Sequence, residues 1–325
     1  MINNLFCMKK CQRMFLAFAF VCTSLLATSV LQAQNTGTKG PAKPKEITLT
    51  APRDGFPISI TYYQSSNAES APVVVLLHGK GGSKRVWDKQ FAPILQQNGY
   101  AVVSVDLRKH GQSKLPETEK TVNRNQKKPA SSKLKTYDYK AMVALDMEAV
   151  WQFIFAEHQK KHLNMQKSAI VASDMSVPIA LNYTLYDWTK VPYDDAPVLA
   201  AKTPKGQTVR ALFLISPVTG VSGVNSMQPT VRLKDPLLGL AFEVGVGQKN
   251  STDLKIANKL YEQLHLAKEK DTRVKINKYP GKLTGTDMLG RRLGLEIDIL
   301  KFLDRHLKKL PGQWADRRPR FDREE

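Results

Sequence analysis

Cysteine is nearly absent from this chain of 325 residues. The three that occur, Cys7, Cys11 and Cys22, all lie within the first 33 residues. If that segment is removed as a leader, the mature chain contains no thiol. This absence excludes disulfides, a cysteine nucleophile and thiolate zinc sites, so stability is expected to come from an ordinary hydrophobic core.

Long apolar runs are also lacking after the N-terminal segment. Residues 1–33 have a basic start, an apolar stretch from Met14 to Leu26, and the small residue Ala33 before Gln34, which is typical of a secretory signal peptide. The apolar run is shorter than the roughly 20 residues that a spanning helix needs. We therefore expect an exported protein, periplasmic or extracellular, with no transmembrane segment in the mature chain; an uncleaved N-terminal anchor is the alternative.

Acidic residues are scarce relative to basic ones. The chain has 29 Asp and Glu against 49 Lys and Arg, a net charge of +20. Loss of residues 1–33 leaves +17, because they hold three basic and no acidic side chains. Such a charge attracts an anionic polymer or surface, whether a phosphate backbone, anionic lipid headgroups or an acidic polysaccharide. Residues 114–135, with seven basic and two acidic side chains, are expected to be a solvated mobile loop or, alternatively, a docking arm.

Motifs for cofactors are missing as well. The sequence shows no metal-ligand cluster, no phosphate-binding loop, no dinucleotide glycine pattern and no specific nucleic-acid motif. We expect no metal and no cofactor. The expected partner is an unknown small-molecule ligand or an anionic polymer or surface.

The chain after the leader is expected to form one large domain. Residues 34–45 are rich in Gly, Pro and Lys and indicate a linker, 46–310 the domain, and 311–325 a charged C-terminal tail. Two extended segments, 46–50 and 57–63, flank turn residues and predict an antiparallel hairpin.

Short apolar runs then alternate with longer segments of helical period, which predicts an α/β fold with a mostly parallel central sheet and helices on both faces. Continuous Val, Ile and Leu runs favour strands buried on both sides. The expected strands are 73–77, 101–105, 168–173, 209–215, 238–244 and 273–279, and the expected helices are 84–97, 138–160, 176–186, 252–267 and 287–309.

Residues 168–181, SAIVASDMSVPIAL, combine an apolar strand, a tight turn and a helix. Small side chains two positions before and after the central Asp174 suit a sharp turn, because strand and helix backbones approach each other closely there. Ala172 and Ser176 meet this requirement.

Two further blocks carry a resemblance to a known family. The block VVVLLHGKGGSKRVW at 73–87 resembles the third strand of α/β-hydrolases with its His-Gly loop, and VVSVDLRKHGQS at 102–113 resembles their Asp-x-Arg-Gly-His-Gly-x-Ser turn, with Lys109 in place of a glycine. Together with the turn at 172–176, they resemble exported bacterial esterase, lipase and serine-aminopeptidase proteins. The resemblance implies the α/β-hydrolase fold over the whole domain. It also implies a lid at 217–236, where about twenty residues suffice for a flap but not for a large cap domain.

The resemblance further implies a serine nucleophile, and Asp174 occupies that position. Ser173 comes one residue early. A shift by one residue turns a side chain to the opposite face of a strand, so we expect Ser173 to point into the packed interior.

The two other triad positions also depart from the family pattern. The acid position falls on Gln248, with Asp253 five residues later as a first-turn helix residue. The histidine is implied in the loop 280–289, which contains none, and His306 lies in a predicted helix. Loss of the central members of a triad lowers turnover by about a million-fold, so the triad is degenerate and efficient acyl transfer is not supported.

An aspartate at the turn has a second interpretation. Some members of the fold use an aspartate nucleophile on haloalkanes or epoxides, and a histidine then activates water to release the alkyl ester. Here His78 and His110 are the candidate surrogate bases, because both lie at the same end of the predicted sheet.

The third interpretation is electrostatic. Backbone N–H groups near Gly79 and Lys80 and of Met175 form the expected oxyanion-hole region, which favours negative charge. We expect the Asp174 carboxylate to accept hydrogen bonds from this region and to repel an oxyanion.

Two hypotheses follow for function. The main one is an exported α/β-hydrolase-like protein that is catalytically impaired and acts in binding or scaffolding. The alternative is an active hydrolase of ester, amide, haloalkane or epoxide substrates, with a rearranged site centred on Asp174.

Overall fold

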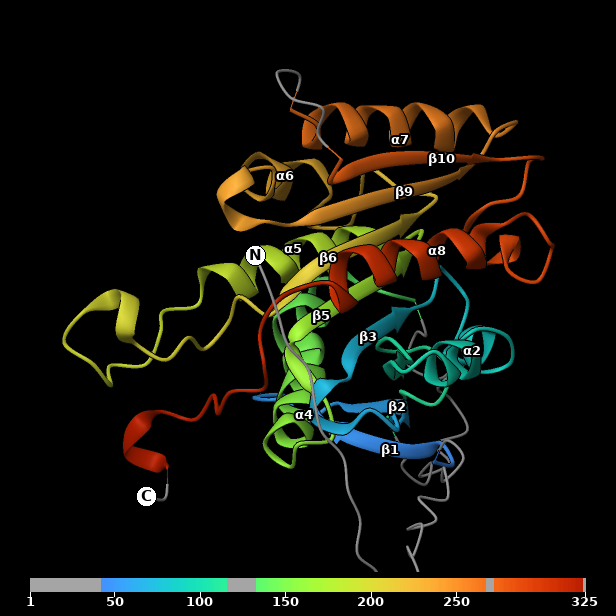
Figure 1. Ribbon diagram of the computed structural model, residues 1–325. Helices are drawn as coiled ribbons and strands as arrows, with labels where there is room; N and C mark the ends of the chain where they lie inside the picture. Colours follow the sequence, from blue (N-terminus) through green and yellow to red (C-terminus); the bar gives the residue numbers. More distant parts are fainter. Residues whose placement is uncertain (1–41, 116–132, 267–271, 324–325) are drawn as a thin grey trace, which may run out of the picture. The chain divides into compact units, whose positions relative to one another are not determined.

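The computed structural model describes residues 42–115, 133–266 and 272–323 (Figure 1). The expected signal peptide at 1–33, most of the expected linker and most of the basic stretch at 114–135 lie outside the described residues. Those predictions are therefore not tested.

The strands of the described residues form one eight-stranded sheet in the order β1-β2-β4-β3-β5-β6-β9-β10 (Figure 1). The first two pair antiparallel and β2 runs antiparallel to β4, whereas all pairs from β4 to β10 are parallel. This confirms the opening hairpin and the mostly parallel sheet. The strands are β1 Lys45–Thr50, β2 Pro57–Tyr63, β3 Pro72–Leu77, β4 Ala101–Val105, β5 Asn164–Ser173, β6 Val209–Ile215, β9 Ala241–Gly247 and β10 Val274–Tyr279.

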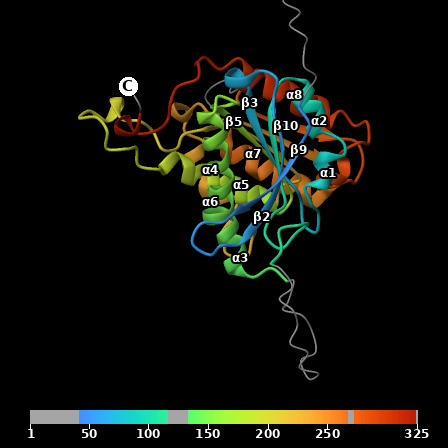
Figure 2. The ribbon, with the colours of Figure 1, turned by 90° about the horizontal axis from the view of Figure 1, so that it is seen from below.

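Helices cover both faces of the sheet (Figure 2). One face packs against α4, α5, α6 and α7, and the other against α1, α2 and α8. The helices are α1 Arg85–Asp88, α2 Ala92–Gln97, α3 Thr136–Ala141, α4 Met147–Gln159, α5 Ser176–Thr189, α6 Met227–Leu233, α7 Ser251–Leu264 and α8 Leu295–Leu303, with π-helical turns at Met142–Asp146 and Asp304–Lys308.

Strand residues alternate between two hydrophobic cores. Along β3, Val73, Val75 and Leu77 pack in the core under α4 and α5, whereas Val74 and Leu76 pack in the core under α2 and α8. All five side chains are fully buried. A continuous apolar run is thus required, because both faces of the strand are covered.

Some predicted boundaries were wrong for local reasons. The strand predicted at 238–244 is β9, which begins only at Ala241 because Pro236–Leu238 form a 3₁₀ turn and Gly239 has a φ of +62°. The helix predicted at 84–97 is split into α1 and α2, with Pro93 in the first turn of α2, where its missing N–H is tolerated.

The helix predicted at 287–309 was also wrong at its start. Gly290 and Gly294 have φ values of +69° and +89°, which end any helix before them, and α8 begins at Leu295. Residues Gly285–Met288 form a separate 3₁₀ turn. This turn follows β10 and brings the loop back to the end of β5.

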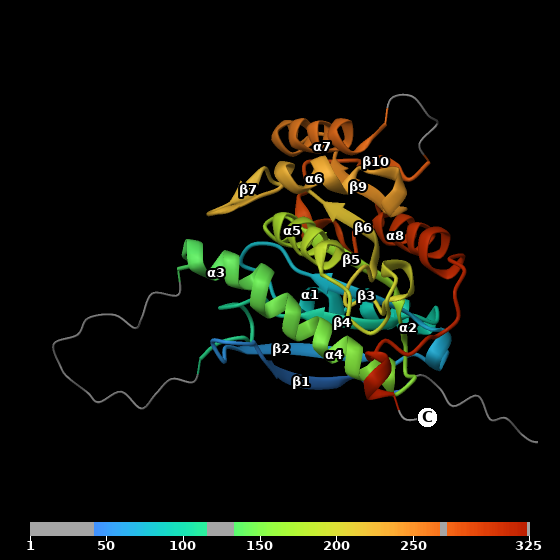
Figure 3. The same cartoon turned by 90° about the vertical axis from the view of Figure 1, so that its left-hand side faces the viewer.

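The expected flap is short. The segment after β6 folds as a two-stranded hairpin, β7 Gly220–Val221 and β8 Val224–Asn225, followed by α6 (Figure 3). No large cap domain is inserted at this point, as predicted.

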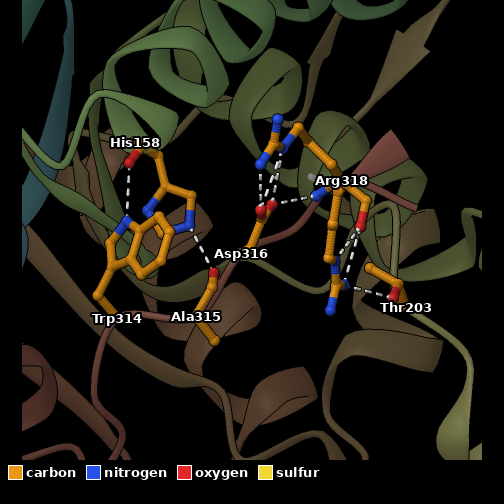
Figure 4. A network of polar contacts seen from close by, with 7 residues as sticks. His158, Thr203, Trp314, Ala315, Asp316 and Arg318 are labelled. Atoms are coloured by element: carbon orange, nitrogen blue, oxygen red, sulfur yellow. Dashed lines mark hydrogen bonds and ion pairs between the residues drawn. The ribbon is translucent and has the colours of Figure 1, made fainter. Parts of the chain in front are cut away.

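The tail after residue 310 packs on the domain (Figure 4). The indole Nε1 of Trp314 donates to the backbone oxygen of His158 at 2.7 Å, and the two rings lie 5.1 Å apart between centroids. Arg317 is only 6% exposed and donates to the backbone oxygens of Pro204 and Gly206. Burial lowers the pKa of Arg317 to about 10. An aromatic contact, a buried cation and several hydrogen bonds therefore fix the tail on the domain.

Candidate functional site

A sharp turn between β5 and α5 presents Asp174. This residue has a φ of +51°, a left-handed conformation that is uncommon for a residue with a side chain. The backbone of two other loops lies against it. A Cβ atom on Gly79 would lie 3.3 Å from the Asp174 Cβ, and one on Gly285 would lie 3.0 Å from the Ser173 Oγ. A side chain at either position would crowd the turn, and Gly285 in addition has a φ of +55°, which favours glycine.

The hydroxyl of Ser176 holds the turn together. Its Oγ accepts a hydrogen bond from the Ser173 N–H at 2.8 Å and lies 2.9 Å from the Ser173 backbone oxygen and 3.3 Å from that of Leu77. The small residue that the sequence predicts at this position thus also links the turn to β3.

Ser173 is fully buried and its hydroxyl has no hydrogen-bond partner among the described residues. The prediction that it points into the packed interior is confirmed. Gly79 and Gly285 both lie against this hydroxyl, since a Cβ atom on them would be 3.4 and 3.0 Å from the Ser173 Oγ.

The carboxylate of Asp174 lies at the loop after β3. Its Oδ2 accepts a hydrogen bond from the Lys80 N–H at 3.1 Å. Within the described residues, no such bond comes from Met175. Burial raises the pKa of Asp174, the Lys80 N–H opposes this shift, and the charge of Asp253 raises the pKa further.

His78 lies next to this loop, but both of its ring nitrogens are engaged. The Nε2 accepts from the Leu107 N–H at 3.1 Å, so the Nδ1 carries the proton and donates to the Gly79 oxygen at 2.7 Å. Burial lowers the pKa of His78 to about 4. The ring therefore stays neutral and ties two loops together.

His110 lies beside His78, with ring centroids 5.0 Å apart and the ring planes tilted by 54°. Its Nδ1 lies 2.9 Å from the backbone oxygen of Arg108. All six histidines of the chain lie within the described residues, and none of them forms a hydrogen bond with Asp174.

Loops from three other strands reach the same edge of the sheet. Gln248 follows β9, has an exposed side chain and donates its backbone N–H to the Tyr279 oxygen at 2.7 Å. The loop after β10 places Gly285 at the turn, where its N–H donates to the Ser216 Oγ at 2.8 Å. No imidazole stands in this loop.

Comparisons with known proteins agree with this geometry. The sequence profile described as alpha/beta hydrolase fold matches residues 72–228. A search of curated protein sequences finds no significant match. Among solved structures, a dienelactone hydrolase from Anabaena variabilis has a TM-score of 0.52 at 15% identity, covering 82% of this chain and 100% of that one. A cold-adapted esterase from an Arctic intertidal metagenomic library has a TM-score of 0.53 at 16% identity, covering 83% and 98%.

The chain has the α/β-hydrolase fold, and residues 72–228 carry the sequence pattern of that family. At these identities the solved structures establish the fold alone. Within that fold, the turn at Asp174 occupies the position of the nucleophile elbow, and the Lys80 N–H lies in the loop after β3 that faces it.

The α/β-hydrolase turn at 106–113 is also present. Asp106 accepts from the backbone N–H groups of Lys84 at 2.7 Å and Gln112 at 2.9 Å. Lys109, which replaces a glycine of the family pattern, has a φ of +64°. The glycine of the family pattern thus corresponds to a left-handed backbone position. Lys109 adopts this conformation, and its Nζ forms an ion pair with the Asp138 carboxylate at 2.7 Å.

Of two further residues near the elbow, Tyr139 was missed by the sequence analysis, and Asp253 was considered only as a distant first-turn helix residue. Asp253, at the start of α7, accepts a hydrogen bond from the Thr284 hydroxyl at 2.5 Å. Its negative charge raises the pKa of Asp174. Tyr139, in α3, has a raised pKa because of burial and of the nearby Asp138 and Asp174. Both come from elements remote in sequence, so only the long-range fold identifies them.

In the described ranges, no group of three or more His, Cys, Asp and Glu side chains is arranged to hold a metal ion. In the same ranges, no helix is both long enough and apolar enough to cross a bilayer.

Proposed function

We propose that this is an exported, non-hydrolytic member of the α/β-hydrolase superfamily that acts by binding or scaffolding. The observation that carries this proposal is the Asp174 carboxylate, which accepts a hydrogen bond from the Lys80 N–H at 3.1 Å. An anion of the protein itself thus lies beside a donor that would otherwise serve a substrate oxyanion.

The chemistry of acyl transfer explains why this matters. The reaction needs a hydroxyl or thiol nucleophile, a base to take its proton and donors for the oxyanion. At the elbow, the Asp174 carboxylate is a negative charge beside the place where a substrate oxyanion would form, so it would repel that oxyanion. The loop after β10 places Gly285 against the elbow, and residues 280–289 of this loop include no histidine that could act as a base.

The alternative is a hydrolase in which Asp174 attacks carbon and His78 or His110 activates water. The hydrogen bonds of His78 to Leu107 and Gly79 oppose this role, because a base needs a free lone pair directed at water. The Nδ1 of His110 donates to the Arg108 oxygen at 2.9 Å, which leaves the Nε2 lone pair available, but within the described residues no hydrogen bond joins this ring to Asp174. No contact of either ring favours the alternative.

A substrate panel tests the proposal. Aryl esters, aminoacyl amides, haloalkanes and epoxides are offered to the wild type and to Asp174→Ala and Asp174→Ser. We expect no multiple turnover from any of the three proteins, since Asp174→Ser restores a hydroxyl but not a base. Turnover by the wild type that disappears in Asp174→Ala would overturn the proposal.

The ligand at the elbow is expected to offer a hydrogen-bond donor or a positive charge. Asp174 is a carboxylate, and the negative charge of Asp253 is close enough to raise its pKa. The basic surface is a separate matter and favours an anionic polymer or surface. Retention on a polyanion column should weaken steeply between low and moderate salt. Salt-independent retention would argue against electrostatic capture.

A further inference from the structure

A cleft lies at the other end of the parallel strands, away from the elbow. It has a volume of about 610 Å³, within the range of small-ligand sites. Its lining comes from the turn before β3, the end of α4, the start of β5 and the tail: Glu69, Ser70, Lys161, Asn164, Lys167 and Trp314. Because β3 and β5 begin here and end at the elbow, the two sites are separate.

The tail forms one wall of this cleft and fixes the indole of Trp314 (Figure 4). The bond from its Nε1 to the His158 oxygen sets the orientation of the ring, and the Nε2 of His158 lies 2.9 Å from the Ala315 oxygen. The aromatic surface is thus held in place before any ligand arrives.

Lys161 stands at the mouth of the cleft in an unusual backbone position. The N–H of His162 bonds to the Glu157 oxygen at 3.0 Å and that of Lys161 to the His158 oxygen at 2.9 Å, which is the hydrogen-bond pattern of a Schellman motif. Lys161 occupies the left-handed position of this motif, with a φ of +60°, where glycine is the usual residue. A residue with a long side chain thus lines the cleft at a position where the backbone conformation favours glycine.

The ammonium of Lys161 lies over the cleft. Its Nζ is 5.0 Å from the centre of the Trp314 ring and 3.6 Å from the Glu69 carboxylate. Both partners of this ion pair are more than half exposed, at 60% and 54%, so the pair is weak and open to exchange. Lys167, a half-buried second cation, makes no ion pair within the described residues.

We propose that this cleft binds an anionic saccharide. The carboxylate or sulfate of the sugar takes the place of Glu69 on Lys161 and pairs with Lys167. The exposed hydroxyl of Ser70, which donates to the Asn67 oxygen at 2.7 Å, can accept a hydrogen bond from a sugar hydroxyl. The fixed indole offers an apolar surface to the C–H face of the sugar ring. This inference does not depend on the function proposed for the elbow.

The test uses isothermal titration calorimetry of the full chain with short oligogalacturonates and with sulfated heparin oligosaccharides. A neutral malto-oligosaccharide serves as the comparison ligand. Binding of either anionic series, with little or none of the neutral one, supports the proposal and identifies the preferred anion. Failure of both anionic series to bind, or equal binding of the neutral sugar, overturns it.

Two variants locate the binding in the cleft. Lys161→Gly removes the cation while restoring the residue that the backbone prefers, and should weaken binding about three- to tenfold without loss of thermal stability. Glu69→Gln removes the competing carboxylate and should tighten binding about twofold. The exposed Lys255→Ala, on α7, is the matched control for charge and should leave affinity nearly unchanged.

The opposite pattern is equally informative. Wild-type affinity in Lys161→Gly, or an equal loss in Lys255→Ala, would show that saccharides bind through general surface charge and would overturn the site. Inorganic sulfate that binds as tightly as the oligosaccharide would reduce the cleft to a simple anion site and overturn the sugar assignment.

Discussion

Asp174 combines two features that each cost folding free energy. Its backbone is left-handed, and its carboxylate is partly buried next to a second negative charge. The single N–H of Lys80 offsets part of this cost. Such a residue is held by the surrounding loops rather than by its own preferences.

The first prediction concerns Asp174→Asn. Because the pKa of Asp174 is raised in the folded state, the protonated carboxyl favours folding, and this contribution is lost as pH rises through the folded-state pKa. At pH 7 the variant should therefore be more stable, by about 0.5–1 kcal/mol. Asparagine also tolerates a left-handed backbone. Urea unfolding followed by circular dichroism measures the difference.

The pH series supplies the control for this prediction. Below the ordinary aspartate pKa of 3.8, both states of the wild type are protonated and its stability should approach that of the variant. A variant less stable than the wild type at pH 7 would mean that the bond from Lys80 outweighs the cost of burial.

The second prediction compares two serines of the elbow. Ser173→Ala removes a buried hydroxyl that has no partner, so stability should be unchanged or slightly higher. Ser176→Ala removes a hydroxyl that bonds to β5 and β3, and should lower the free energy of unfolding by about 1–3 kcal/mol. Equal losses in both variants would contradict the hydrogen-bond assignments.

The residues of the site were only partly predictable. The position of Asp174 follows from the local pattern of small residues, since the turn is formed within five consecutive positions. Asp253 was dismissed as a distant helix residue, yet it acts on Asp174 from the start of α7. Asp253 lies near Asp174 because β5, β6 and β9 are adjacent in the sheet. This strand order cannot be read from the spacing of nearby residues in the sequence.

Among the elements, the junction of β4 with the π-helical turn before α4 depends on one buried arginine. The guanidinium of Arg108 forms two hydrogen bonds with Asp146, at 3.0 and 2.5 Å, and one with Asp54 at 2.7 Å. Burial raises the pKa of Asp146 to about 6, although the arginine opposes the shift. The ion pair therefore links three segments remote in sequence.

The third prediction concerns Arg108→Met. Loss of the guanidinium leaves the carboxylate of Asp146 buried and unpaired, which should lower the free energy of unfolding by about 3–5 kcal/mol. The double variant with Asp146→Leu should recover part of this loss. Lys308→Ala, which breaks the exposed pair with Asp304, should change stability by less than about 1 kcal/mol. Guanidinium chloride unfolding of the four proteins would show whether the order holds.

Element types were easier to predict than element ends. Strands such as β4 and β6 were placed correctly, because their apolar runs are bounded by polar or turn residues. The start of α8 was misplaced by eight residues, since the left-handed glycines at 290 and 294 lie inside a stretch whose other residues favour helix. Glycine conformation is decided by the tertiary path of the loop.

On the scale of the whole molecule, the C-terminal tail is part of the folded unit. Trp314 covers His158, and the Arg317 side chain is inserted against the carbonyl groups of the loop before β6. The sequence suggested only a charged tail, because eight of its residues after 314 are ionisable and their partners are distant.

The fourth prediction is that a chain ending at Leu310 is less stable by about 2–4 kcal/mol. The truncation exposes the His158 surface and leaves the oxygens of Pro204 and Gly206 without their buried donor. Phe321→Ser, at a side chain that is 72% exposed, should leave stability unchanged. Coincident urea transitions of the truncated and full-length proteins would contradict this role of the tail.

The occupied elbow has a practical consequence for finding proteins of this kind. Phosphonate reagents that label serine hydrolases form a covalent bond to an activated hydroxyl, whereas the accessible group at residue 174 is a carboxylate and the adjacent hydroxyl is sealed inside. Chemical profiling of an extract would therefore pass over this protein even where it is abundant. A reagent that binds the folded surface non-covalently, rather than a covalent label, would be needed to detect it.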